Sequence, residues 1–177
     1  MSLNVAFRKW NDPAIIAENP DLASILPDAT IKRVVRSESS GTTEVFTSAL
    51  AAFASDNSQI VWTLGTSSLL SKWPNENSTN ISKQKGSSGV SDYVFNNKNT
   101  IAYNTAGSVI THLNAKIKNR QGNYVAPTVA SCSSAMNDFI DSFDSRFTVN
   151  LVNAPGANSY PISSYSYLYY RTSSIEE

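Results

Sequence analysis

The chain has 177 residues, 41% of them apolar, and its 14 basic and 14 acidic side chains give a formal net charge of zero. This length can bury one hydrophobic core, and the apolar fraction excludes a disordered chain. Proteins that bind duplex nucleic acid need a basic face that displaces counterions, and the lysines here form only short runs. We therefore expect no nucleic-acid partner.

Cysteine usage and the chain start exclude further classes. Cys132 is the single cysteine, which rules out an intrachain disulfide and a cysteine metal cluster. No apolar run approaches the about 18 residues of a membrane span. The first residues carry neither the basic nor the apolar region of a signal peptide. A cytosolic protein and a mature exported domain are both open interpretations.

The first half of the chain predicts two helices and a strand. Asp12 before Pro13 is typical of an N-cap followed by the first helical position. Residues 31–36 predict a short β-strand. Residues 42–54 predict an amphipathic helix, capped by Ser39 or Ser40. Its apolar stripe consists of Val45, Phe46, Ala49, Leu50 and Phe53.

The middle of the chain is more polar. Residues 57–74 show no clear pattern, and residues 75–89 predict a loop that contains two glycosylation sequons, at Asn77 and Asn80. A helix over residues 88–96, with Val90, Tyr93 and Val94 inward, and a strand over residues 100–103 follow. A short helix is expected from there to about His112.

The last third predicts a hairpin, a helix and two strands. Residues 115–125 form the hairpin, which turns at residues 121–123. A helix begins at Pro127 and Thr128, and strands are expected over residues 147–152 and in the tail, residues 160–171. That helix carries Val129, Cys132, Met136, Phe139 and Ile140. Strands that alternate with helices predict an α/β fold with a mixed, mostly parallel sheet flanked by helices, in one domain spanning residues 1–177.

Residues 36–42 predict an anion site where the first strand passes into a helix. The first amides of a helix have no partner within it, and the helix dipole adds positive charge there. Gly41 leaves room for an anion, Ser40 and Thr42 add hydroxyl donors, and Arg36 offers a bidentate guanidinium that Glu38 could hold in place. Taken locally, an ordinary helix cap is also an open interpretation, since such caps far outnumber anion sites.

An enzyme is not expected. The chain lacks a Gly-x-Ser-x-Gly elbow and a nucleotide-phosphate loop, and His112 is its only histidine. No His or carboxylate cluster has metal-ligand spacing. We therefore predict no catalytic residues, no metal and no cofactor.

Six further segments stand in order along the chain with residues 36–42. They are residues 10–15 (WNDPAI), 72–74 (KWP), 85–90 (KGSSGV), 101–103 (IAY), 125–128 (VAPT) and 160–163 (YPIS). Together the seven resemble the phosphate-binding proteins of ABC transporters, and residues 36–42 resemble that family's Arg-x-acidic-x-Ser-Gly-Thr signature. The chain departs from the family at Glu38, where aspartate is usual, at Ser39, where glycine is common, and at residues 104–107.

The resemblance implies a single lobe of a type II periplasmic-binding-protein fold, exported without its signal peptide. It implies that Arg36, Ser40, Gly41 and Thr42 contact inorganic phosphate, with Glu38 and Ser39 in support. The expected partners are phosphate, a missing first lobe or second chain, and an ABC permease. An exposed lobe contact face also makes a homo-oligomer an expectation. The alternative is a non-catalytic interaction or structural module that keeps the fold without tight ligand binding.

Overall fold

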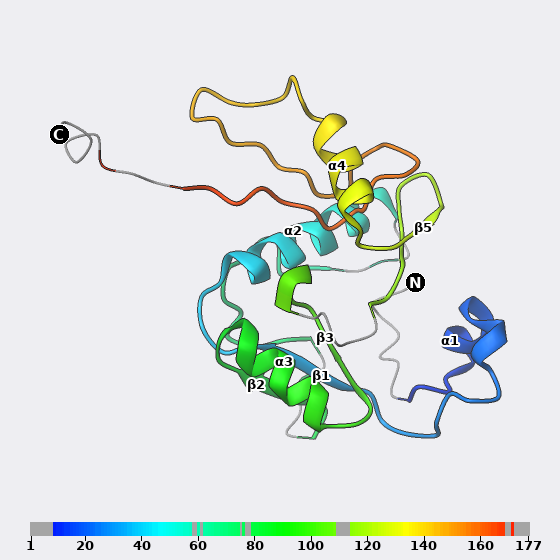
Figure 1. Ribbon diagram of the computed structural model, residues 1–177. Coiled ribbons are helices and arrows are strands. Elements are labelled where there is room, and N and C mark those ends of the chain that lie inside the picture. The colour runs from blue at the N-terminus through cyan, green and yellow to red at the C-terminus, as the bar shows by residue number, and fades with distance from the viewer. Residues whose placement is uncertain are drawn as a thin grey trace. The chain divides into compact units, whose positions relative to one another are not determined.

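The chain forms two compact units in the computed structural model, Met1–Ala115 and Lys116–Glu177 (Figure 1). The described residues are 9–57, 60, 62–74, 76, 79–108, 114–168 and 171. In these ranges no helix is both long and apolar enough to cross a membrane. The same ranges hold no group of three or more His, Cys, Asp or Glu side chains that could bind a metal ion.

The first unit is built on a parallel three-stranded sheet in the order β2-β1-β3. The strands are β1 (Lys32–Arg36), β2 (Ile81–Gln84) and β3 (Thr100–Ala102). Val34 and Val35 of the central strand point to opposite faces and are both buried, as is typical of a strand covered on both sides. The predicted strands near residues 31–36 and 100–103 are confirmed.

The first unit also contains helices. They are α1 (Pro13–Glu18), α2 (Gly41–Asp56) and α3 (Gly86–Asn96), with short 3-10 helices η1 (Pro20–Leu22) and η2 (Ala106–Ser108). Asp12 caps α1 as predicted, since its carboxylate accepts the Ala14 amide at 3.0 Å. α3 packs against all three strands and buries Val90 (Figure 1). The fold class, α/β with a parallel sheet flanked by helices, is confirmed; His112 lies outside the described residues.

The buried face of α2 is more polar than its predicted stripe. Ala49 and Leu50 are buried, but Thr43 and Thr47 are buried beside them, whereas Val45, Phe46 and Phe53 are half-buried. The Thr47 hydroxyl accepts the Ser67 amide and donates to the Ser67 carbonyl, both at 2.9 Å. These bonds explain how a threonine replaces an apolar residue in the core.

The predicted loop over residues 75–89 is wrong in its second half. Residues 81–84 form β2, which pairs in parallel with β1. The sequence of β2 is polar, so its extended conformation depends on backbone hydrogen bonds to β1 and not on intrinsic propensity. Asn80 directly precedes this strand, and Asn77 lies outside the described residues.

The second unit contains the predicted hairpin and helix. Strands β4 (Ile117–Lys118) and β5 (Tyr124–Val125) pair antiparallel, and Gly122 in the turn has a φ of 86° that favours glycine. α4 (Val129–Asn137) begins with a capping box between Thr128 and Ser131. It ends before Phe139 and Ile140, which the prediction had included.

Residues 138–168 form no strand, so the predicted strands over residues 147–152 and in the described part of the tail are wrong. Side chains bind this segment's backbone instead of a β-ladder. The side-chain amide of Asn119, through Nδ2, donates to the carbonyls of Gly156 at 3.2 Å and Ala157 at 2.8 Å. Phe147 also adopts a φ of 57°, which interrupts an extended strand.

Candidate functional site

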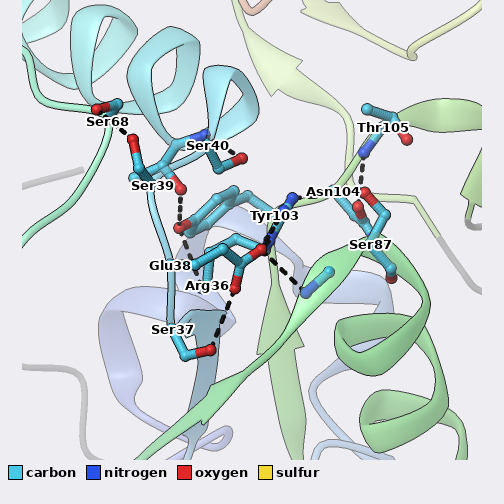
Figure 2. Close-up of polar contacts among 12 residues, drawn as sticks. Arg36, Ser37, Glu38, Ser39, Ser40, Ser68, Ser87, Tyr103, Asn104 and Thr105 are labelled. Carbon is cyan, nitrogen blue, oxygen red and sulfur yellow. Dashed lines mark hydrogen bonds and ion pairs between the residues drawn. The ribbon is translucent and has the colours of Figure 1, made fainter.

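The carboxyl ends of the three parallel strands gather the candidate residues at one edge of the sheet (Figure 2). β1 ends at Arg36 and leads into α2, β2 leads into α3, and β3 is followed by Tyr103. Ligands of open parallel sheets bind at this edge, where loops and helix N-termini converge. Residues 36–42 therefore lie where such a fold places its site.

Ser40 is the N-cap of α2, which decides between the two predicted caps. The Thr43 amide donates to Ser40 Oγ at 3.5 Å, and the Glu44 amide donates to the Ser40 carbonyl at 3.0 Å. Gly41 and Thr42 are the first two helical residues, so their amides have no acceptor within the helix. These two donors and the helix dipole favour an anion at this end of α2.

Gly41 is exposed, and a Cβ atom added there would meet no heavy atom within 4 Å. Its backbone also has no positive φ that would require glycine. Packing within the described part of the chain therefore does not explain a glycine at this position. What the glycine does provide is open space beside the Gly41 backbone.

Arg36 is held in one orientation by its neighbours (Figure 2). Its Nε donates to Glu38 Oε1 at 2.7 Å, and its Nη2 donates to the same oxygen. Its Nη1 lies 3.5 Å from Ser87 Oγ in the first turn of α3. The side chain is only 12% exposed, so the guanidinium is fixed at the edge of the sheet and does not extend into solvent.

Glu38 connects Arg36 to α3. Its Oε1 also accepts the Gly86 amide at 3.0 Å, and its Oε2 accepts the Ser37 hydroxyl at 3.1 Å. Lys85 provides no side-chain cap for α3, so the Glu38 carboxylate takes that role. The Arg36 hydrogen bond is the main cause that lowers the pKa of Glu38 to about 2, with smaller contributions from Gly86 and Ser37.

A loop that the sequence left unassigned supports the start of α2. Ser39 Oγ donates to Ser68 Oγ at 2.9 Å, and the Ser40 amide donates to the Ser68 carbonyl at 2.9 Å. Ser68 carries no sequence signal, because its residue type and spacing match any polar loop. Its contact with residues 39–40 depends on the tertiary fold.

Tyr103 is a second residue that sequence reasoning missed. Its hydroxyl accepts the Arg36 amide at 3.3 Å and shares a hydrogen bond with Thr43 Oγ1 at 2.8 Å. Its ring stacks on Phe46 with centroids 4.4 Å apart, and Trp73 packs beside both rings. Burial raises the pKa of Tyr103, so the hydroxyl stays protonated at neutral pH. Its place at the end of the predicted strand over residues 100–103 and its place within the segment IAY were the available signals, and neither pointed to a role in the site.

Comparison with known proteins gives the context of this site. A family model described as the PBP superfamily domain matches residues 5–176. The phosphate-binding protein PstS of Methanocaldococcus jannaschii is 30% identical over 167 residues, covering 90% of this chain and 42% of that protein. The phosphate-binding protein PstS of Xylella fastidiosa strain Temecula1 is 32% identical over 162 residues, with the same two coverages.

A third relative is much longer than this chain. It is a protein of Acanthamoeba polyphaga mimivirus named as a serine/threonine-protein kinase/receptor, 29% identical over 167 residues. The match covers 90% of this chain and 10% of that protein. The chain thus spans less than half the length of each of these three relatives. Because the family model covers nearly the whole sequence, the chain belongs to the PBP superfamily.

Proposed function

We propose that this chain is an oxyanion-binding lobe of a solute-binding protein and that its ligand is inorganic phosphate. The observation that carries the proposal is a helix N-terminus whose first two amides have no intrahelical acceptor, separated only by residues 37–40 from an arginine that Glu38 holds in place. Similarity to proteins named as phosphate-binding supports the choice of ligand. A planar guanidinium and convergent amides suit a tetrahedral oxyanion.

The contact residues in this proposal are Arg36, Ser40, Gly41 and Thr42. Ser40 Oγ accepts the Thr43 amide, which leaves its hydroxyl proton free to donate to an anion. Glu38 and Ser39 support the site, since Glu38 orients Arg36 and Ser39 ties the loop to Ser68. The open space around Gly41 adds support, because a ligand that approaches closely would account for a glycine there.

The proposed lobe, residues 1–177, works with a second lobe that closes over the anion. The chain matches 42% of the length of the PstS relatives, which leaves room in proteins of that size for such a lobe. In this proposal the complete protein acts outside the cytoplasm and delivers phosphate to an ABC permease. Self-association of the chain stays a prediction.

The Arg36→Ala variant tests the proposal. Phosphate at about ten times its dissociation constant should stabilise the wild-type chain by about 1.4 kcal/mol and raise Tm by about 4 °C. The variant should lose this phosphate-dependent shift because it lacks the charged donor. Thermal unfolding with and without phosphate, at constant ionic strength, measures it. Arg146→Ala is the matched control, since Arg146 is a highly exposed arginine in the second unit.

Arg36→Ala also leaves Glu38 without its ion-pair partner, so a second variant guards against misfolding. In Gly41→Ala the added Cβ meets no protein atom within 4 Å, so this variant should fold normally. The methyl group should nevertheless hinder the approach of phosphate and reduce the phosphate-dependent rise in Tm. A phosphate shift that persists in both variants would contradict the proposed site.

A second candidate function is an interaction module within a larger receptor. It is favoured by the mimivirus relative, a named kinase/receptor of which the matched region is only 10%. In this case the wild-type chain would show no phosphate-dependent shift, and Arg36→Ala would change nothing in a ligand titration. The same experiment therefore separates the two functions.

A further inference from the structure

We propose that Tyr103 is a positioning residue of the oxyanion site, and that its hydroxyl sets the spacing between Arg36 and the first turn of α2. This inference rests on the proposed function, and it adds a residue that the ligand-contact set does not contain. Tyr103 lies directly after β3, the strand beside β1 at the same edge of the sheet.

The hydroxyl of Tyr103 joins two elements that the chain connects only through a loop. One partner is the backbone amide of Arg36, the last residue of β1, at 3.3 Å. The other is Thr43 Oγ1, in the first turn of α2, at 2.8 Å. Residues 37–40 lie between them, and Ser37 and Ser39 in that loop are exposed. The Tyr103 hydroxyl thus forms a hydrogen bond at each end of this loop.

Both partners of the Tyr103 hydroxyl are connected to the proposed ligand contacts. The Thr43 amide is bound by Ser40 Oγ, so the Tyr103 contact reaches the N-cap through a single residue. On the other side, the Arg36 backbone that Tyr103 holds carries the guanidinium fixed by Glu38. A shift at the hydroxyl would therefore move the arginine and the helix amides relative to each other.

Several contacts fix the ring that carries this hydroxyl. It stacks on Phe46 with an interplanar angle of 10°, and Trp73, itself 5% exposed, lies 5.8 Å away between centroids. A tyrosine has two side-chain torsions, and this packing restrains both. The hydroxyl is also committed to Arg36 and Thr43, so its role is to position them and not to contact the ligand.

Oxyanion recognition is sensitive to this spacing. Charged hydrogen bonds are short, about 2.7–2.9 Å, so donors displaced by a few tenths of an ångström no longer reach two oxygens together. Supporting hydrogen bonds are what hold such donors within about 0.5 Å of the productive geometry. The Tyr103 hydroxyl bonds both sides of the site at once, the Arg36 backbone at the end of β1 and Thr43 in the first turn of α2.

The Tyr103→Phe variant tests the inference, because it keeps the stacked ring and removes only the hydroxyl. Inorganic phosphate titrated into the full chain, followed by NMR chemical shifts at constant ionic strength, should show about fivefold weaker binding. Tyr93→Phe is the matched control. Its hydroxyl lies 3.5 Å from Lys32 at the opposite end of β1, so that variant should bind phosphate like the wild type.

A double-mutant cycle with Thr43→Val separates positioning from general stability. Both single variants should weaken phosphate binding, and the double variant should weaken it by less than the product of the two effects, because they remove one shared hydrogen bond. A purely structural role would lower Tm without phosphate and leave the dissociation constant unchanged. That result would overturn the inference.

The proposed function and this inference fail in different ways. If the wild-type chain binds phosphate, Arg36→Ala abolishes binding and Tyr103→Phe binds like the wild type, the positioning role is wrong while the anion site stands. If the wild-type chain shows no phosphate-dependent change at all, both are overturned.

Discussion

Glu38 is the residue whose ionisation matters most to the site. One of its oxygens, Oε1, accepts hydrogen bonds from the Arg36 guanidinium and from the Gly86 amide at the start of α3. The carboxylate therefore orients a proposed ligand contact and caps a helix at once. Protonation would weaken both interactions, because a neutral carboxyl group is a poorer acceptor and no longer attracts the arginine.

This coupling predicts a pH dependence of stability. The pKa of Glu38 is about 2 in the folded chain, below its ordinary value of 4.5. A carboxylate whose pKa is lower when folded stabilises the fold above the unfolded value. Its contribution is lost as the pH falls from 4.5 toward about 2. Urea unfolding across this range should show the loss in the wild type and a flatter curve in Glu38→Gln.

Asp28, Glu76 and Asp144 also have pKa values lowered from their ordinary values, so they too add stability that is lost in acid. The informative quantity is therefore the difference between the wild type and Glu38→Gln at each pH. Asp92→Asn, which removes an exposed carboxylate from α3, corrects for the change in net charge. Parallel curves for the wild type and Glu38→Gln would mean that the Arg36–Glu38 pair adds nothing to folding.

Among the elements, the irregular segment after α4 shows how side chains substitute for a β-ladder. Asp138, the C-cap of α4, accepts the Gly156 amide at 2.8 Å and the Ser159 hydroxyl at 2.6 Å. Ser159 and Leu151 of this segment are both buried. This network closes a long loop against the helix without any strand pairing.

Gly156 is the position where this network leaves no room for a side chain. A Cβ there would lie 2.6 Å from both Asp138 Oδ2 and Ser159 Oγ, far inside van der Waals contact. We expect Gly156→Ala to lower the free energy of unfolding by about 2 kcal/mol, as overpacking does. Chemical denaturation measures this value.

The matched control for this substitution is Gly107→Ala in η2, where an added Cβ meets nothing within 4 Å. It should leave stability unchanged or raise it slightly, because alanine has less conformational freedom in the unfolded chain. Equal effects of the two substitutions would contradict the packing explanation.

For the molecule as a whole, the described site offers donors from one lobe only. Two or three charged hydrogen bonds in a site open to water contribute about 4 kcal/mol in total. That corresponds to a dissociation constant on the order of millimolar. Closure by a second lobe would exclude water and strengthen each of these contacts.

The isolated chain should therefore bind phosphate weakly. Calorimetry at neutral pH should give a dissociation constant on the order of millimolar. Micromolar affinity would show that this chain, alone or as a dimer, already forms a closed site. Light scattering on the same sample would then distinguish a monomer from a dimer.

Local patterns predicted the elements whose residues carry strong signals of their own. Asp12 and Pro13 marked the start of α1, and Gly122 marked the hairpin turn. They failed where partners far along the chain decide the conformation. β2 is polar and becomes a strand only beside β1, whereas residues 147–152 have β propensity but find no strand to pair with in the described structure.

In the candidate site, too, local signals were predictable and long-range contacts were not. The sequence by itself determined the α/β class, a helix capped by Ser39 or Ser40 and the run from Arg36 to Thr42, because strand, cap and donor types are encoded within a few residues. Only the tertiary structure decided that Gly86, Ser68 and Tyr103 contact this run. These contacts join residues 29 to 67 positions apart, and only the pairing of β1 with β2 and β3 and the packing around α2 bring such residues together.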